Sequence, residues 1–504
     1  PTLCELAAAV APDNLPALVA PPNLIPAGCT RIAPDMLTLV QLSQEAIDRI
    51  VASVPGGAAN VQDIYPLAPL QQGMFFHHVG ASEGDPYLLG ALLSLDERAM
   101  VDTYLSALQA VLSRHDILRT SVQWEGLDAP VQVVWRHADL PVQEYALDAA
   151  DGDIADQLWA RVDPLHHRID IRTAPLMRVA LAHDAAQGRW LLAMQYHHLA
   201  IDHTAMEVLQ REVQAYMVGR ESELPPPQPF RQFVAQTLSG SETAAHEAFF
   251  GKLLGDIDAP TAPFDLLDVQ EGGMDVCEAR LPVEPALGRR LRERARLLGV
   301  SAASLHHLAW ALVLARTTGR RDVVFATVLF GRLQGGQDAA RSLGMFINTL
   351  PVRFTLDDTG VREAVRQAQG TLSELLRHEN ASLALAQRCS GVEPPLPLFT
   401  TLLNYRHGDL PPEPVDDTAA PVRLLRAHER TNYPLLLSVD DGSEGFTLSA
   451  QTQRPLDPAR ICAYMHQALQ DLVQALEQEP ARPWRTLDAM PATERAQLLA
   501  SASG

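Results

Sequence analysis

The sequence has few cysteines and lacks the glycine motifs that bind nucleotides. The five cysteines are odd in number, form no CxxC pair and have no histidine neighbour: Cys4, Cys29, Cys277, Cys389 and Cys462. This pattern argues against a disulfide framework, a zinc site and a cysteine nucleophile, and we expect reduced, mostly buried thiols. Residues 331–336 are rich in glycine but lack the lysine of a P-loop, and no GxGxxG sequence is present.

Positive charge and long apolar runs are also scarce. The sequence has 40 lysines and arginines against 61 aspartates and glutamates, a net charge of −21. This charge would repel nucleic acid and anionic membranes, so we expect neither as a partner. No apolar run approaches the roughly 20 residues of a membrane span, and the N-terminus does not resemble a signal peptide. We therefore expect a soluble, cytoplasmic protein.

Both ends of the chain look like parts of a longer protein. Residues 1–10 have the pattern of a short helix, and a proline-rich stretch without clear periodicity follows to about residue 33. Near the other end, prolines at 480 and 483 precede a second short amphipathic stretch at 491–499. We expect a module from a multidomain chain.

Strands alternate with helices on both sides of a proline cluster at 225–229. Before the cluster, we expect strands at 87–97, 129–137, 174–181 and 190–195 and a helix at 100–114. After it, we expect helices at 284–298, 302–317, 361–378 and 457–478 and strands at 322–330, 400–405, 421–428, 434–440 and 446–452. The 504 residues thus predict two α/β halves, and a channel between them is the default place for chemistry.

The stretch 195–204 (QYHHLAIDHT) places two imidazoles and a carboxylate where a strand ends and a helix begins. Histidine has an unperturbed pKa of about 6.5, so it can exchange protons near neutrality. Because neighbouring residues on a strand face opposite ways, we expect one of His197 and His198 to act and the other to support it. Asp202 would cap the helix, or pair with Arg119 or Arg178. The plainer alternative is one buried imidazole, one exposed imidazole and a simple cap.

Several ordered motifs make residues 37–478 resemble the condensation domain of non-ribosomal peptide synthetases. The family's HHxxxDG signature is present at 197–203, with His203 in place of the glycine. The RHxxLRT element is present at 114–120. Residues 344–353 (GMFINTLPVR) are similar to the GxFxNTxxxR stretch, and residues 430–435 (RTNYPL) to the late element that ends in Pro-Leu.

The resemblance implies an α/β fold of two chloramphenicol-acetyltransferase-like lobes, which form a V-shaped pseudo-dimer with a central tunnel. It implies a carrier-domain remnant and linker at 1–36, an N-terminal lobe at 37–228, a C-terminal lobe at 229–482 and a linker toward an adenylation domain at 483–504. Upstream and downstream peptidyl carrier domains would each insert a 4'-phosphopantetheine arm. No cofactor or metal bound by this chain itself is implied.

A second resemblance concerns the subtype. Residues 65–74 lead into residues 77–85 (HHVGASEGD), which are similar to the HH[IL]xxxxGD motif of dual epimerization/condensation domains. The matching residues are His77, His78, Gly84 and Asp85. Such domains are understood to invert the donor Cα before forming the peptide bond.

By the same resemblance, His198 is the central residue, with His197 and Asp202 beside it. Whether His198 is a base or only positions the amine and stabilises an oxyanion stays open. His203 adds an imidazole or signals altered activity, whereas Asn348 and Arg119 either support the site or belong to the scaffold. An ordinary condensation domain and a silent domain that recruits partners remain alternatives.

Overall fold

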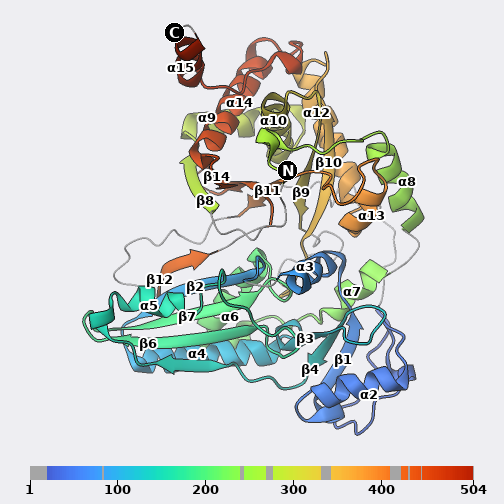
Figure 1. The fold of residues 1–504 in the computed structure, drawn as a ribbon, viewed down its shortest axis with the longest axis vertical. Coiled ribbons are helices and arrows are strands. Elements are labelled where there is room, and N and C mark those ends of the chain that lie inside the picture. The colour runs from blue at the N-terminus through green and yellow to red at the C-terminus, as the bar shows by residue number, and fades with distance from the viewer. Residues whose placement is uncertain are drawn as a thin grey trace.

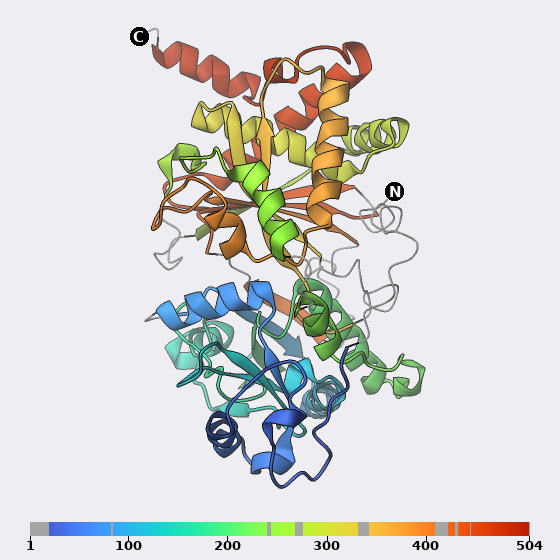
Figure 2. The ribbon, with the colours of Figure 1, turned by 90° about the vertical axis from the view of Figure 1, so that its right-hand side faces the viewer.

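The computed structural model describes residues 20–81, 84–238, 243–267, 276–330, 342–408, 422–428, 432–443 and 445–502. Figures 1 and 2 show two lobes stacked along the long axis of the molecule. We call the lobe that holds residues 20–238 the first lobe and the other the second lobe. Strand β12 (Val422–His428), late in the sequence, lies in the first lobe (Figure 1).

The first lobe is built around a five-stranded sheet with the order β12-β2-β7-β6-β5. Helices pack on both faces of this sheet, so all eight residues of β2 are buried, which explains its continuous apolar sequence. Strands β2 and β7 are antiparallel, with Leu88 opposite His197. The strands are β2 (Leu88–Leu95), β5 (Val142–Tyr145), β6 (Met177–Asp184) and β7 (Arg189–His197). The helices are α3 (Pro69–Gly80), α4 (Arg98–Arg114), α5 (Ile154–Ala160), α6 (His203–Met217) and α7 (Arg231–Leu238).

A smaller sheet with its own core extends the first lobe. Its order is β1-β4-β3, and it consists of β1 (Val61–Pro66), β3 (Thr120–Gln123) and β4 (Val131–Trp135). Helix α2 (Gln44–Ser53) packs against it together with Ile25 and Ile32. The proline-rich segment expected as a linker is therefore, from residue 20 onward, irregular in backbone but anchored by buried side chains.

The second lobe has a six-stranded sheet with the order β10-β9-β11-β13-β14-β8. The buried helix α10 and its neighbours form a single large core with this sheet. The strands are β8 (Val276–Pro282), β9 (Asp322–Leu329), β10 (Asn348–Thr355), β11 (Thr401–His407), β13 (Leu435–Asp441) and β14 (Phe446–Gln453). The helices are α8 (Thr243–Leu254), α9 (Pro285–Leu298), α10 (Ala302–Thr318), α12 (Val361–Leu376), α13 (Leu383–Arg388), α14 (Pro458–Gln478) and α15 (Ala492–Ala502).

The chain crosses between the lobes more than once. Strand β12 pairs antiparallel with β2 and closes the edge of the first sheet. Phe230 and Val234, from the segment around α7, belong to the first lobe's core, as do Met345 and Phe346 just before β10. The expected division at residue 228 therefore does not coincide with the packing units, because apolar side chains from beyond it complete the first core.

Most expected elements are present, with boundaries shifted by a few residues. The elements that the sequence analysis did not name include α3, α5 and β8. The four described cysteines are free, and Cys29 and Cys462 are buried. Residues 1–10, 331–336 and 430–431 lie outside the described residues. No single described helix is long and apolar enough to cross a membrane, and only α9 and α10 taken together, bent by 110°, meet that test.

Candidate active site

His198 lies at the tip of β7, where the strand turns toward α6. Its backbone N–H donates to the carbonyl of Tyr87 at 2.9 Å, one residue before β2. Its ring Nδ1 lies 2.9 Å from the carbonyl oxygen of Ile201. Because a carbonyl only accepts hydrogen bonds, Nδ1 carries a proton, and in the neutral ring the basic lone pair is on Nε2. The ring is thus held in the tautomer that a proton acceptor needs.

The His198 side chain borders a cavity between the two lobes. The first lobe contributes residues from α3, α6 and the β7 tip, and the second lobe contributes one face of β11 and β13. Along this face, Leu402 lies opposite Leu436, and Arg406 lies opposite Asp440, with which it forms an ion pair. The cavity wall is therefore apolar at one end of the strands and charged at the other. The lining residues include Tyr87, His198, His203, Glu207 and Asn432.

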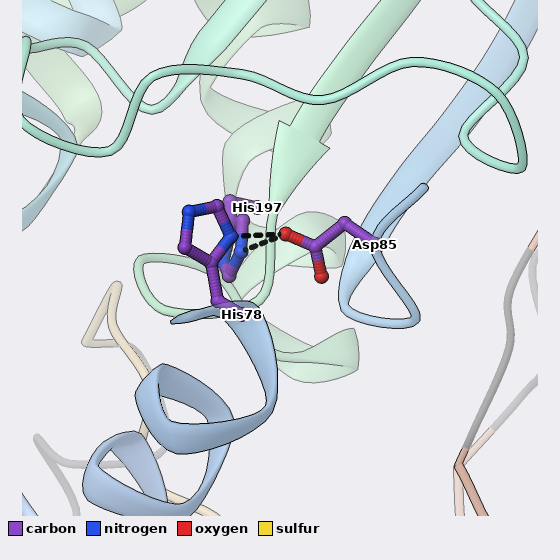
Figure 3. Close-up of side chains that lie close together, drawn as sticks. All are labelled: His78, Asp85 and His197. Carbon is purple, nitrogen blue, oxygen red and sulfur yellow. Dashed lines mark hydrogen bonds and ion pairs between the residues drawn. The ribbon is translucent and has the colours of Figure 1, made fainter. Parts of the chain in front are cut away.

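His197 faces away from the cavity, as the alternation of strand residues predicts. Its side chain is fully buried, and Nε2 lies 3.0 Å from Oδ2 of Asp85. Nδ1 of His78, on α3, lies 2.5 Å from the same oxygen (Figure 3). Oδ1 of Asp85 accepts the backbone N–H of Tyr87 at 2.9 Å. We call His78, Asp85 and His197 the buried brace.

Hydrogen bonding fixes the tautomer of His197 within the brace. Nδ1 of His197 accepts the backbone N–H of Leu199 at 3.0 Å, so this nitrogen cannot carry a proton. The proton of the neutral ring is therefore on Nε2, from which it is donated to Asp85. Burial opposes ionisation of Asp85, yet the imidazoles of His197 and His78 hold the pKa of its carboxyl well below the usual value. Burial also lowers the pKa of His197, which favours the neutral ring, although Asp85 opposes this shift.

Two histidines and a carboxylate this close also invite comparison with a metal site. A ligating imidazole normally donates its second N–H to a neighbour. In His197 the second nitrogen instead accepts an N–H, so coordination through Nε2 would require an imidazolate. The donor pattern thus fits a hydrogen-bonded carboxylate and does not fit a metal ion.

Gly84 supplies the turn that brings Asp85 into the brace. Its φ is +61°, a conformation that glycine adopts readily. A Cβ here would lie 2.3 Å from the carbonyl oxygen of Leu165, so no other residue fits without a backbone shift. Arg168 ties down the preceding end of α3 by donating to the carbonyls of His78 and Ala81. Local packing thus accounts for the Gly-Asp pair of the early motif.

His77 lies outside the brace and contacts Asn432 and Tyr87. Its Nε2 is 3.1 Å from Nδ2 of Asn432, and its ring is beside that of Tyr87. Burial lowers the pKa of His77, although the charge of Asp85 opposes this. Asn432 and Tyr87 both line the cavity, so His77 contacts two residues of the cavity lining. The two neighbouring histidines therefore have different surroundings.

Asp202 joins the loop between β7 and α6 to a segment late in the sequence. Oδ1 accepts the N–H of Ala205 at 2.7 Å as the cap of α6, and Oδ2 accepts the N–H of Phe346 at 3.1 Å. The expected pairing with Arg119 or Arg178 is wrong. Arg119 donates to the backbone carbonyls of residues 112, 135 and 136 and to the side chain of residue 62, and Arg178 donates to Gln195. Both arginines are held by nearer acceptors.

The remaining candidates divide between the cavity and the scaffold. His203 lines the cavity, is 34% exposed and lies 3.7 Å from Glu207, one turn further along α6. Asn348 is buried, donates to the carbonyls of Glu379 and Ala381, and accepts the N–H of Thr349. Both ends of its side-chain amide are therefore hydrogen-bonded to backbone groups. Arg119, with its carbonyl partners, likewise belongs to the scaffold.

Sequence reasoning did not single out Tyr87 or Asn432. Tyr87 follows the early motif by two residues, and Asn432 lies within the stretch matched to the late element. Both residues thus lie in or beside recognised motifs, but the sequence around each gives no indication that their side chains meet. The hydroxyl of Tyr87 donates to Oδ1 of Asn432 at 2.9 Å across 345 residues of sequence.

Comparisons with known proteins identify the family of this chain. The family model described as "Condensation domain" matches residues 61–499. Malpibaldin synthetase and malpinin synthetase, both from Mortierella alpina, are each 48% identical over 99% of this chain, which spans 9% and 6% of their lengths. The chain thus corresponds to less than a tenth of either relative.

Solved structures show the same fold. The first condensation domain of the calcium-dependent antibiotic synthetase, in complex with a substrate analogue, aligns with a TM-score of 0.63 at 18% identity, over 84% of this chain and 98% of that one. A four-domain nonribosomal peptide synthetase bound to AMP and glycine aligns with a TM-score of 0.69 at 17% identity, over 86% of this chain and 34% of that one. The chain therefore belongs to the condensation-domain family of nonribosomal peptide synthetases.

Proposed function

We propose that this chain forms a peptide bond between a donor thioester on an upstream carrier domain and an acceptor aminoacyl thioester on a downstream carrier, after inverting the donor Cα. Each substrate would arrive on a 4'-phosphopantetheine arm, and the two arms would meet beside His198 in a tunnel that opens at both ends of a V-shaped pair of lobes. The neighbouring adenylation and carrier domains would belong to the same synthetase. The single observation that supports condensation at this place is the cavity between the lobes, with the His198 ring on its wall.

In the condensation step, the acceptor nitrogen attacks the donor carbonyl carbon. The C–N bond forms, the C–S bond breaks, the ammonium proton leaves and the departing thiolate takes up a proton. The lone pair on Nε2 of His198 is suited to receive the proton that leaves the acceptor nitrogen, because Nδ1–H already donates to the carbonyl of Ile201. A positioned general base of this kind contributes about 10²- to 10⁴-fold to a rate.

Inversion of the donor needs proton transfer on both faces of Cα. One group removes the Cα proton, the thioester carbonyl becomes an enolate, and another group returns a proton to the opposite face. The observation that supports inversion is a second imidazole, His203, in the same cavity as His198. His203 stands where the family signature has glycine, so this chain carries an imidazole at a position where the signature has no side chain.

A second candidate is condensation without inversion. The observation that favours it is the buried brace, because it gives His78, Gly84 and Asp85 a structural role that requires no contact with substrate. In that case the early motif would maintain the fold around His198 and the donor would keep its configuration.

One experiment in deuterated water distinguishes the candidates. The upstream carrier is loaded with an L-aminoacyl group, the chain and a loaded acceptor carrier are added, and Cα deuterium and product stereochemistry are followed. Deuterated D-L peptide supports inversion followed by condensation, unlabelled L-L peptide supports the second candidate, and neither exchange nor peptide contradicts both.

Two variants assign the groups in the same assay. His198→Ala is expected to abolish exchange and peptide formation. His203→Gly, which restores the family residue, is expected to lower exchange at least tenfold while leaving condensation of a supplied D-donor near the wild-type rate. Full exchange in His203→Gly would reject His203 as the second acid or base.

A further inference from the structure

Asn432 connects the lobes at the cavity through both ends of its side-chain amide. Oδ1 accepts the hydroxyl proton of Tyr87 at 2.9 Å, and Nδ2 lies 3.1 Å from Nε2 of His77. Both partners belong to the first lobe, whereas Asn432 is three residues before β13 of the second lobe. A single side chain of the second lobe thus bonds two elements of the first.

Tyr87 relays this contact to the catalytic histidine. Its backbone carbonyl accepts the N–H of His198 at 2.9 Å, and its backbone N–H donates to Asp85. The same residue therefore contacts Asn432 through its side chain, and His198 and the buried brace through its backbone. A displacement of the Tyr87 ring would change the support under His198.

The Tyr87 hydroxyl is suited to a fixed donor role. Burial, with Tyr433 and Asp85 adding to it, raises the pKa of Tyr87 well above its ordinary value. The hydroxyl stays protonated at all pH values at which the reaction would be assayed. Its contact with Asn432 is then a neutral hydrogen bond, whose strength does not depend on pH in that range.

We propose that Asn432, Tyr87 and His77 form a clasp between the lobes, and that Tyr87 and Asn432 are positioning residues that hold His198 in place for condensation. The inference needs only the condensation step and not inversion of the donor. Loss of the clasp lets the second lobe move relative to Tyr87, so His198 spends less time in the reactive arrangement. The effect is expected on kcat, because the clasp acts on His198 through the backbone carbonyl of Tyr87.

Tyr87→Phe removes one hydroxyl and keeps the ring. A typical hydrogen bond corresponds to a few-fold to about tenfold change in an equilibrium, so kcat is expected to fall by about three- to tenfold with KM for the loaded acceptor carrier nearly unchanged. Asn432→Leu, which keeps the branching at Cγ but has no polar atoms, is expected to lower kcat by at least as much. The double variant should be no slower than Asn432→Leu alone, because both changes break the same contact.

A conservative variant tests for rescue. Asn432→Asp keeps an acceptor for the Tyr87 hydroxyl, so its kcat should exceed that of Asn432→Leu by several-fold. Tyr216→Phe is the matched control, because Tyr216 lies on α6 in the same lobe but does not line the cavity. All variants are assayed in the full 504-residue chain with a supplied D-donor and L-donor, and thermal unfolding is measured alongside.

The wild-type rate distinguishes a failure of the proposed condensation from a failure of the clasp. If wild-type chain forms no peptide with either donor, the proposed function is rejected, and the positioning role of the clasp is rejected with it. If wild-type chain is active and Tyr87→Phe and Asn432→Leu keep its kcat, the clasp is rejected. It is also rejected if Tyr216→Phe slows the reaction as much as Tyr87→Phe, or if the variants lower the unfolding temperature while kcat of the folded chain is unchanged.

Discussion

The buried brace makes a sharp prediction for Asp85→Asn. The carboxylate of Asp85 accepts three N–H groups, from His78, His197 and the backbone of Tyr87. Asparagine has one oxygen and one NH2 group, so one side of the new amide must face an N–H donor. His78 can change tautomer, but His197 cannot, because its Nδ1 must accept from Leu199. Neither orientation of the amide satisfies every donor.

The cost can be estimated from the contacts. A buried donor left without a partner costs about 1–3 kcal/mol, and hydrogen bonds to a charged group are worth about 1.5–3 kcal/mol each. Since Asp85 is buried and some relaxation will occur, we expect Asp85→Asn to lower the free energy of unfolding by about 2–4 kcal/mol at pH 7. Because Tyr87 is displaced as well, the rate of condensation should fall.

Urea unfolding followed by fluorescence provides the measurement, with Asp128→Asn, an exposed site, as control. The folded pKa of Asp85 lies below its unfolded value, so the ionised form stabilises the fold above about pH 4, and this contribution is lost as the pH falls further. The difference between wild type and variant should persist from pH 7 to pH 5 and shrink below about pH 4. An unchanged midpoint at pH 7 would refute the proposed bonding, and a midpoint that chelators lower and zinc restores would support a metal instead.

Three further changes test separate parts of the fold. Gly84→Ala places a Cβ 2.3 Å from the carbonyl of Leu165 and should destabilise the chain by about 2–4 kcal/mol in urea titrations; a fully stable variant would contradict the turn geometry. Asp202→Ala removes the α6 cap and the bond to the N–H of Phe346, so unfolding should become easier by about 1–3 kcal/mol and kcat should fall, both measured against wild type. Burial of His306 within α10 lowers the pKa of its imidazole to about 4, so the unfolded chain binds more protons and stability falls as the pH drops from about 6.5 to about 4. Between pH 7 and pH 5, wild type should therefore lose about 2 kcal/mol of stability that His306→Leu keeps, and parallel pH profiles of the two chains would exclude this.

The sequence predicts best what depends on local periodicity. The helix of α6 and the strand of β7 follow from spacing within a few residues, and the opposite directions of His197 and His198 follow from strand geometry. The motif order indicated the family before any contact was known. The ends of the chain are less well predicted, since buried side chains such as Ile25 fix a segment that has no periodic pattern.

Contacts between distant segments could not be predicted from local pattern. Asp85 meets His197 across 112 residues, and Tyr87 meets Asn432 across 345. The early motif reads as two equivalent histidines, yet only the fold shows that His78 is inside the brace and His77 is against Asn432. The error about the partner of Asp202 has the same origin, because its second acceptor contact comes from the backbone of Phe346.

Strand β12 has a consequence for how this protein can be divided. It supplies the outer strand beside β2, whose residues are all buried, although it is encoded more than 320 residues later. A gene split in the connection between the lobes would give a first half whose sheet ends in an open apolar edge, which favours aggregation. The two halves should therefore be expressed together. When parts are exchanged between synthetases, both lobes should be moved as one unit.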